Sequence, residues 1–308
     1  DTALGGEGLP PVLGVAVEEI GMACAHAFMM YGAFCPSAAQ MLARLGEPWM
    51  REHVVPALVA GRWTATMCLT EPHCGTDLRQ IRSRAEPQAD GSWLLRGTKI
   101  FISGGDHDMT EAIAHIVLAK VADADGHVNP GLGAVHVFLV PSRLVDPADG
   151  RLGARNAVQV ASIEHKMGIG ASATCVLNFD DAKAWRIAGR GEGSAANMAA
   201  MFMMMNHARV GTAISGVAYA EIAYQNARQY ARERLSGRHP DGPRRPELPA
   251  DPIVVHPDVR RLLLDTRAFA EGARATAMRA AVWQSLARHS PDADERERAG
   301  DLLELMTP

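Results

Sequence analysis

The residues best suited to chemistry lie in the segment Thr66–Asp77, which reads TMCLTEPHCGTD. The β-type run that enters it ends at Glu71 and the proline after it, because proline fixes φ and removes an amide donor. Beyond that point, Gly75 permits a tight backbone, and Thr76 offers side-chain and main-chain polar groups. This arrangement suits a polar heterocycle or a phosphate. It is also how an ordinary strand ends, and the segment alone leaves both interpretations open.

The cysteines predict structural thiols. They are odd in number and scattered, and they lack CxxC spacing or nearby histidine partners. We therefore expect reduced thiols, no disulfide framework and no bound metal. The five residues are Cys24, Cys35, Cys68, Cys74 and Cys175.

Four collinear segments together resemble a known family. The segment above is similar to the "TEPxxGSD" signature of the FAD-dependent acyl-CoA dehydrogenases, with Thr76 in place of the usual serine. The other three segments are Gly97–Gly105, which resembles "GxKxWITN"; Lys166 to Thr174, which resembles "KMGxxxSxT"; and Arg209 with Tyr230–Arg234, which resembles a helix ending "YaxxRxxFG". In addition, Asp251–Arg260 resembles the larger branch typified by 3-methylmercaptopropionyl-CoA dehydrogenase.

The resemblance implies a flavoenzyme. Such enzymes desaturate an acyl-CoA thioester between Cα and Cβ: a carboxylate takes the α-proton and FAD accepts the β-hydrogen as hydride. It further implies an acyl-CoA substrate, an electron-transfer flavoprotein as acceptor, and a homodimer or homotetramer. Two alternatives stay open, namely a fragment that binds FAD or acyl-CoA without catalysis, and an acyl-CoA oxidase. The resemblance begins late and ends early, so we expect the chain to be truncated at both ends.

The resemblance also assigns roles to individual residues. For the cofactor these are Met67, Leu69 and Thr70 along the flavin, Phe101 in place of the family's tryptophan, Ser103 in place of the threonine near flavin N5, and Arg234 toward the pyrophosphate of a neighbouring subunit's FAD. For the substrate they are Thr76, Asn206 and Arg209. His256 is assigned to the adenosine portion of the same FAD that Arg234 reaches. Five of these residues have a stated structural alternative: core filling for Phe101, a strand-end or turn hydroxyl for Ser103 and Thr76, an ion pair for Arg209, and a solvated cation for Arg234.

The catalytic base is not identified. In most of the family it lies in the distal C-terminal region, and a minority place it beside the arginine that Arg209 matches, where this chain has Ala208. Glu221 and Glu304 match neither location, and Glu71 belongs to the strand-ending motif, for which we expect a structural role. The base is therefore expected outside this chain.

Three regions must position these residues. Helical spacing fills the first part, with helices expected over Val12–Met30, Ser37–Leu45 and Pro48–Leu58. Period-two patterning follows, with strands expected over 63–70, 79–86, 92–103, 113–121, 134–140 and 172–179, including a pair joined by the turn Asp123–Gly126. Long helices are expected over Met198–Arg234 and from Pro257. We therefore predict an α+β fold with an N-terminal helical part (1–65), a middle β-barrel or sandwich (66–190) and an incomplete C-terminal helical bundle (191–308).

The bulk composition sets limits on function. The chain has 308 residues, 47% hydrophobic and 21% charged residues, and a net charge of -4, which gives no electrostatic case for nucleic-acid binding. No apolar run was found that approaches the roughly 20 residues needed to cross a bilayer, and no signal peptide is evident. The reduced thiols expected above indicate a cytoplasmic protein.

Overall fold

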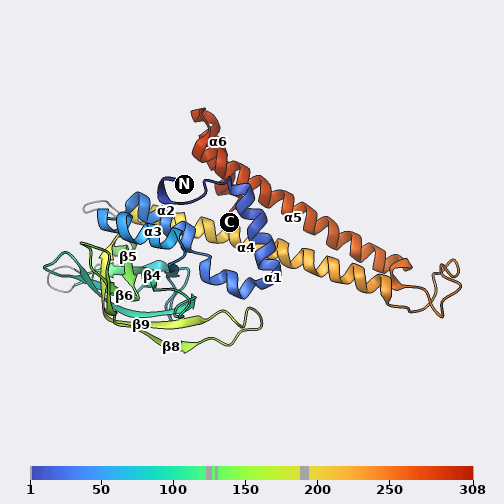
Figure 1. The fold of residues 1–308 in the computed structure, drawn as a ribbon, viewed down its shortest axis with the longest axis horizontal. Coiled ribbons are helices and arrows are strands. Elements are labelled where there is room, and N and C mark those ends of the chain that lie inside the picture. The colour runs from blue at the N-terminus through green and yellow to red at the C-terminus, as the bar shows by residue number, and fades with distance from the viewer. Residues whose placement is uncertain (1, 123–126, 129–130, 188–193, 308) are drawn as a thin grey trace. The chain divides into compact units, whose positions relative to one another are not determined.

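The computed structural model describes residues 2–122, 127–128, 131–187 and 194–307. It divides into two compact units (Figure 1). Unit 1 contains residues 1–8 and 27–208, and unit 2 contains residues 9–26 and 209–308. The helix α1 (Pro11–Gly32) contributes to both units, and its backbone leaves helical geometry at Ala25, next to the boundary. The predicted division at residues 65 and 190 stays a prediction.

Unit 1 is built on a sheet that closes on itself. Its strands are β1 (Trp63–Cys68), β2 (Arg84–Pro87), β3 (Trp93–Ser103), β4 (Ala112–Val121), β5 (Val135–Pro141), β8 (Val158–Ile163) and β9 (Thr174–Arg186). The pairing runs β4–β2–β3–β9–β5 and returns to β4, while β8 pairs with β9. Closure leaves few unpaired edges, which is the usual advantage of a barrel. The α+β fold with a central sheet and helical flanks is confirmed.

Strand β1 joins this sheet in parallel to β4, with Thr66 opposite His115. Residues 112–120 of β4 are all buried, because one face points into the barrel and the other lies under helices. These helices are α2 (Cys35–Leu45), a short π-helix (Met50–Val54) and α3 (Val55–Val59). They occupy the segments predicted to be helical.

In the part of the chain that the structure describes, the sequence patterning missed three strands. β8 is exposed along most of its length, and β6 (Arg143–Val145) and β7 (Leu152–Arg155) are short, so none carries a clear period-two pattern. Residues 79 and 80, predicted to begin a strand over 79–86, lie instead in a 3-10 helix (Leu78–Gln80) begun by the side chain of Asp77. The predicted turn Asp123–Gly126 lies outside the described residues, although β4 and β5 pair as expected.

Unit 2 is helical. It holds the second part of α4 (Ser194–Glu233), α5 (Pro257–His289) and α6 (Ala293–Met306). Arg274 of α5 lies 2.6 Å from Glu19 of α1 and 2.8 Å from Glu221 of α4, so one guanidinium joins three helices. Glu221, rejected as a base from the sequence, therefore has a structural partner. The charged segment 293–300 is the first part of α6.

One apolar segment contradicts the expectation that no apolar run is long enough to cross a bilayer. Residues Pro11–Leu45 are long and apolar enough to cross a bilayer by length and composition, with a mean hydropathy of 1.5 in an 18-residue window. That criterion does not establish a span, because core helices and signal sequences also meet it. The segment contains the backbone break at Ala25, and its Glu19 is paired with Arg274.

Candidate functional site in unit 1

A buried ion pair organises the end of β1. The side chains of Lys99 and Glu71 are 0% and 2% exposed, and Nζ of Lys99 donates to Oε1 of Glu71 at 2.8 Å. The same ammonium donates to the carbonyl oxygen of Leu69 at 3.1 Å. Glu71 also accepts the backbone amides of Arg82 at 2.8 Å and Ser83 at 3.0 Å. The pair thus connects three stretches of backbone.

The pair meets the conditions under which buried charges are tolerated, because both groups have several hydrogen-bond partners. Burial acts to raise the pKa of Glu71, but the Lys99 ammonium and the hydrogen bonds from Ser83 and Arg82 hold that pKa below its ordinary value. Burial lowers the pKa of Lys99, opposed by the negative charge of Glu71. Glu71 is therefore held ionised as a structural anchor, in agreement with the structural role expected for it.

The segment after β1 also pairs with β3. The amide of Ile100 donates to the carbonyl oxygen of Thr70 at 2.9 Å. Ser103 lies three residues further along β3, opposite Thr174 of β9. Both hydroxyl-bearing side chains are partly exposed, and among the described residues the structure gives neither hydroxyl a hydrogen-bond partner. Two predicted flavin-contacting residues thus belong to adjoining, mutually anchored backbone segments.

Phe101 lies between them in an unusual conformation. Its φ is 60°, in the left-handed region that bulky residues rarely adopt, and its ring is 59% exposed. The register of β3 against β9 shifts between Lys99 and Ile102, so a bulge carries the aromatic side chain out of the sheet. Strained, exposed apolar residues concentrate at functional sites. The structural alternative of core filling is therefore wrong for Phe101.

Met67 and Leu69 point to the opposite side of the strand from Thr66 and Cys68. Both are half-buried and contact the hydrophobic cluster between the sheet and the helices, whereas Cys68 belongs to the barrel interior. Part of each side chain is therefore accessible at the end of β1. Their assignment to the flavin stays a prediction.

Thr76 is exposed in the loop that follows the Glu71–Cys74 turn. Its carbonyl oxygen accepts the Leu78 amide at 3.1 Å. The next residue, Asp77, is engaged by Arg79, and these contacts hold the pKa of that carboxyl well below its usual range. The loop is thus ordered by Asp77, and the Thr76 side chain is left on the surface, where a substrate contact is a prediction.

A buried polar pair beneath β1 was not predicted from the sequence. Oγ1 of Thr66 lies 2.8 Å from Nδ1 of His115, whose side chain is buried. Burial, reinforced by the nearby His107, lowers the pKa of His115 to about 3, so the imidazole is neutral inside the barrel. A histidine in an apolar strand gives no signal in period-two patterning, which is why it was overlooked.

Glu71, His73 and Cys74 place three potential metal-ligand atoms within 4.8 Å of one another. The Lys99 ammonium already neutralises Glu71, and Nε2 of His73 lies 2.9 Å from the carbonyl oxygen of Gln80. A cation at this position would face a buried positive charge. The donor set therefore favours a structural role for these three residues over a metal site.

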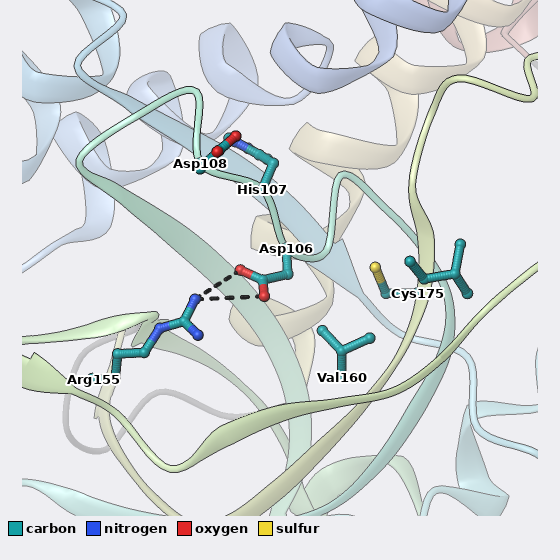
Figure 2. A pocket seen from close by; sticks show the side chains of 7 residues that line it. Asp106, His107, Asp108, Arg155, Val160 and Cys175 are labelled. Atoms are coloured by element: carbon teal, nitrogen blue, oxygen red, sulfur yellow. Dashed lines mark hydrogen bonds and ion pairs between the residues drawn. The ribbon is translucent and has the colours of Figure 1, made fainter.

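A cavity of about 410 Å³ lies elsewhere in unit 1 (Figure 2). Its lining includes Asp106, Arg155 and Cys175, and Asp106 pairs with Arg155 at 3.1 Å. Thr70 and Ser103 do not line this cavity, and Cys175 lies on the other face of the sheet from Thr174 and Ser103. We do not assign it to the flavin.

The remaining predicted residues lie on the helices. Asn206 is in the part of α4 that belongs to unit 1, and Arg209 begins the part that belongs to unit 2; both are half-buried and have partners. Arg234 is exposed directly after α4, and Nε2 of His256 lies 2.7 Å from the carbonyl oxygen of Ser236. Whether these residues complete the site of unit 1 stays a prediction.

Comparisons with known proteins agree with this geometry. Residues 66–182 match the family described as acyl-CoA dehydrogenase, middle domain. The chain is 39% identical over 304 residues to 3-methylmercaptopropionyl-CoA dehydrogenase of Ruegeria pomeroyi, covering 99% of this chain and 50% of the relative. It is 36% identical over 312 residues to the broad-specificity linear acyl-CoA dehydrogenase FadE5 of Mycobacterium tuberculosis, covering 98% and 49%.

A solved structure has the same fold. The acyl-CoA dehydrogenase from Bacillus anthracis, complexed with FAD, superposes with a TM-score of 0.73 at 21% identity, covering 96% of this chain and 45% of that one. The chain spans about half the length of the curated relatives it matches. The motifs, the closed sheet and these similarities lead to one conclusion: the chain belongs to the acyl-CoA dehydrogenase family.

Proposed function

We propose that the protein to which this chain belongs oxidises an acyl-CoA thioester to its α,β-unsaturated product and uses FAD as the hydride acceptor. The observation that carries the proposal is the Glu71–Lys99 pair with its surroundings. It anchors the segment of Thr70 to the strand of Phe101 and Ser103, and all three side chains are left accessible. Bound FAD would supply the two-electron acceptor for the β-hydrogen.

The residues present fit a flavin. An isoalloxazine ring needs apolar contact on its faces and hydrogen-bond partners along its polar edge. The exposed ring of Phe101 and the half-buried side chains of Met67 and Leu69 supply apolar contact, and the hydroxyls of Thr70 and Ser103 supply polar groups. Phenylalanine lacks the indole N–H of tryptophan, so a contact through that donor is not available here.

For the substrate, we propose that Thr76, Asn206 and Arg209 contact the acyl-CoA. A guanidinium is suited to phosphate and to developing negative charge on a thioester oxygen. The two named relatives act on a methylmercaptopropionyl-CoA and on linear acyl-CoAs, and these are the first substrate classes to test. The catalytic base is proposed to lie outside this chain. Cytoplasmic location, an electron-transfer flavoprotein as acceptor and a homodimer or homotetramer belong to the same proposal.

The test is anaerobic mixing of the full-length protein with a panel of acyl-CoAs, followed by the flavin absorbance. Bleaching by at least one acyl-CoA, with release of the enoyl-CoA product, is expected. Rapid reoxidation by air would instead indicate an oxidase. A yellow protein that no acyl-CoA bleaches would contradict the proposed substrate class, and a protein without flavin would contradict the proposal as a whole.

A further inference from the structure

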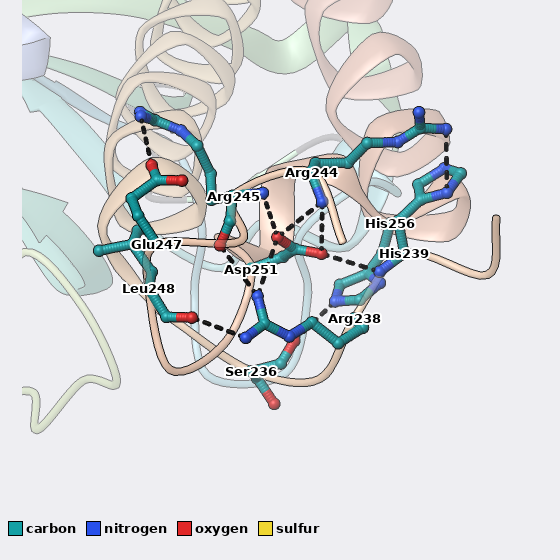
Figure 3. A network of polar contacts seen from close by, with 9 residues as sticks. All are labelled: Ser236, Arg238, His239, Arg244, Arg245, Glu247, Leu248, Asp251 and His256. Carbon is teal, nitrogen blue, oxygen red and sulfur yellow. Dashed lines mark hydrogen bonds and ion pairs between the residues drawn. The ribbon is translucent and has the colours of Figure 1, made fainter. Parts of the chain in front are cut away.

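A buried carboxylate organises the loop between α4 and α5 (Figure 3). The side chain of Asp251 is 0% exposed. It accepts the backbone amides of His239 at 3.0 Å, Arg244 at 3.0 Å and Arg245 at 2.7 Å, and Nη1 of Arg238 lies 3.5 Å away. Four residues separated by up to seven positions in the chain therefore converge on one side chain.

The loop is closed by further contacts to its own backbone. Arg238 donates to the carbonyl oxygens of Arg245 at 3.0 Å and Leu248 at 2.6 Å. The amide of Asp251 donates to the carbonyl oxygen of Gly237 at 2.9 Å, and the amide of Ser236 donates to that of Asp251 at 2.9 Å. This loop, which holds five prolines between α4 and α5, is thus given a single conformation by side-chain and backbone hydrogen bonds.

This loop fixes the backbone of Arg234. The carbonyl oxygen of Arg234 accepts the Ile253 amide at 2.8 Å, and Leu235 bridges to Pro252, directly after Asp251. The amide of Arg234 donates to the Tyr230 carbonyl oxygen at 2.8 Å and so continues the helix. Arg234 is therefore held from α4 on one side and from the loop on the other.

The cations of the loop differ in their partners. Arg238 pairs with Asp251, Arg244 lies 3.6 Å from Asp241, and Arg245 lies 3.2 Å from Glu247. Within the described part of the chain, the structure records no ion pair for Arg234, whose side chain is exposed. The arrangement leaves this guanidinium available to an external anion.

We propose that Asp251 is a positioning residue for the cofactor, because it holds the loop that fixes Arg234 for contact with the FAD pyrophosphate of a neighbouring subunit. This inference rests on the proposed FAD-dependent function, with Arg234 in the role that the family resemblance implies for it, and adds the residue on which that role depends. An asparagine at position 251 would bring one carbonyl oxygen and two N–H donors among several donors, so it cannot reproduce the network.

The experiment uses the full-length protein with FAD. Asp251→Asn is expected to raise the FAD dissociation constant about tenfold, because backbone donors left unsatisfied destabilise the loop. Trypsin is expected to cut faster after Arg238 and Arg244. Asp241→Asn is the matched control, since Asp241 is in the same loop but exposed, and it should alter neither result.

A double variant separates positioning from general destabilisation. If Asp251 acts through Arg234, then adding Asp251→Asn to Arg234→Ala lowers FAD affinity no further than Arg234→Ala alone. Additive losses, or unchanged affinity in Asp251→Asn while Arg234→Ala weakens binding, would overturn the inference. If Asp251→Asn does not fold, Arg238→Gln takes its place, because it loosens the same loop. The same two measurements, FAD affinity and the rate of trypsin cleavage, then test the inference. Failure of Arg234→Ala to weaken binding would instead contradict the proposed function of Arg234.

Discussion

The ammonium of Lys99 lies 2.8 Å from a carboxylate oxygen of Glu71 and 3.1 Å from the carbonyl oxygen of Leu69, and it is fully buried. One cation thus secures both the turn after β1 and the middle of β3. The flavin-contacting residues assigned by resemblance flank these anchor points in the sequence: Leu69 and Thr70 precede Glu71, and Phe101 follows Lys99. The glutamate and lysine of the two motifs act together in holding the backbone next to the residues proposed to contact the flavin.

Breaking the pair is expected to destabilise the protein strongly. Glu71→Gln leaves the Lys99 ammonium buried without a counter-charge, which costs about 3–5 kcal/mol of unfolding free energy. Denaturant unfolding measures this loss. Glu86→Gln is the control, because its pair with Arg84 is partly exposed and contributes less than about 1 kcal/mol. Equal effects of the two substitutions would contradict the role assigned to the buried pair.

The same carboxylate gives a pH signature. The pKa of Glu71 is lowered in the folded protein, so its stabilising effect is present above the unfolded pKa and is lost as pH falls through the folded pKa. The stability difference between the wild type and Glu71→Gln should therefore persist at neutral pH and shrink below about pH 4.3, the ordinary glutamate value. A difference that disappears already between pH 7 and 6 would exclude this explanation.

His115 predicts a separate acid sensitivity. Its folded pKa of about 3 lies below its ordinary value of 6.5, so the unfolded chain binds more protons between these values and stability falls as pH is lowered through that range. The slope contributed by one group reaches at most about 1.4 kcal/mol per pH unit. His115→Gln should remove this contribution in urea unfolding measured at several pH values. An unchanged slope would show that the imidazole is not held neutral.

Phe101 allows stability and cofactor binding to be separated. Phe101→Gly places glycine at φ 60°, where it is not strained, and removes a ring that is mostly exposed. Unfolding free energy of the flavin-free protein should stay the same or rise by up to about 1 kcal/mol. FAD affinity should fall, as measured by flavin fluorescence titration. Loss of stability together with unchanged FAD affinity would assign the ring to packing.

The fold was predictable where hydrophobic periodicity and turn residues are clearest in the sequence. The helices and the paired strands β2, β3, β4 and β5 follow from periodicity and turn residues. Closure of the sheet and the parallel pairing of β1 with β4 could not be predicted, because they depend on strand contacts distant in the chain. β8 was missed because its exposed residues carry no alternation.

The candidate site was predicted only in part. Motif resemblance identified Thr70, Phe101 and Ser103, and the structure brings their backbone segments together. It did not identify Lys99 as the partner of Glu71, because two charges 28 positions apart give no local signal. The role of Asp251 could not be predicted from its branch motif either, since it arises from backbone amides that meet the side chain in three dimensions.

The most direct test of the account is FAD titration of the full-length protein and of the variants Thr70→Val, Ser103→Ala and Thr98→Val. Thr98 is the control, because it lies on β3 together with Ser103 and its hydroxyl already donates to the side-chain oxygen of Asn178 at 2.8 Å. The account predicts that the first two variants each weaken FAD binding several-fold, by about 0.5–1.5 kcal/mol for one lost hydrogen bond, while Thr98→Val leaves it unchanged. Unchanged affinity in both Thr70→Val and Ser103→Ala would contradict the placement of the flavin at the end of β1.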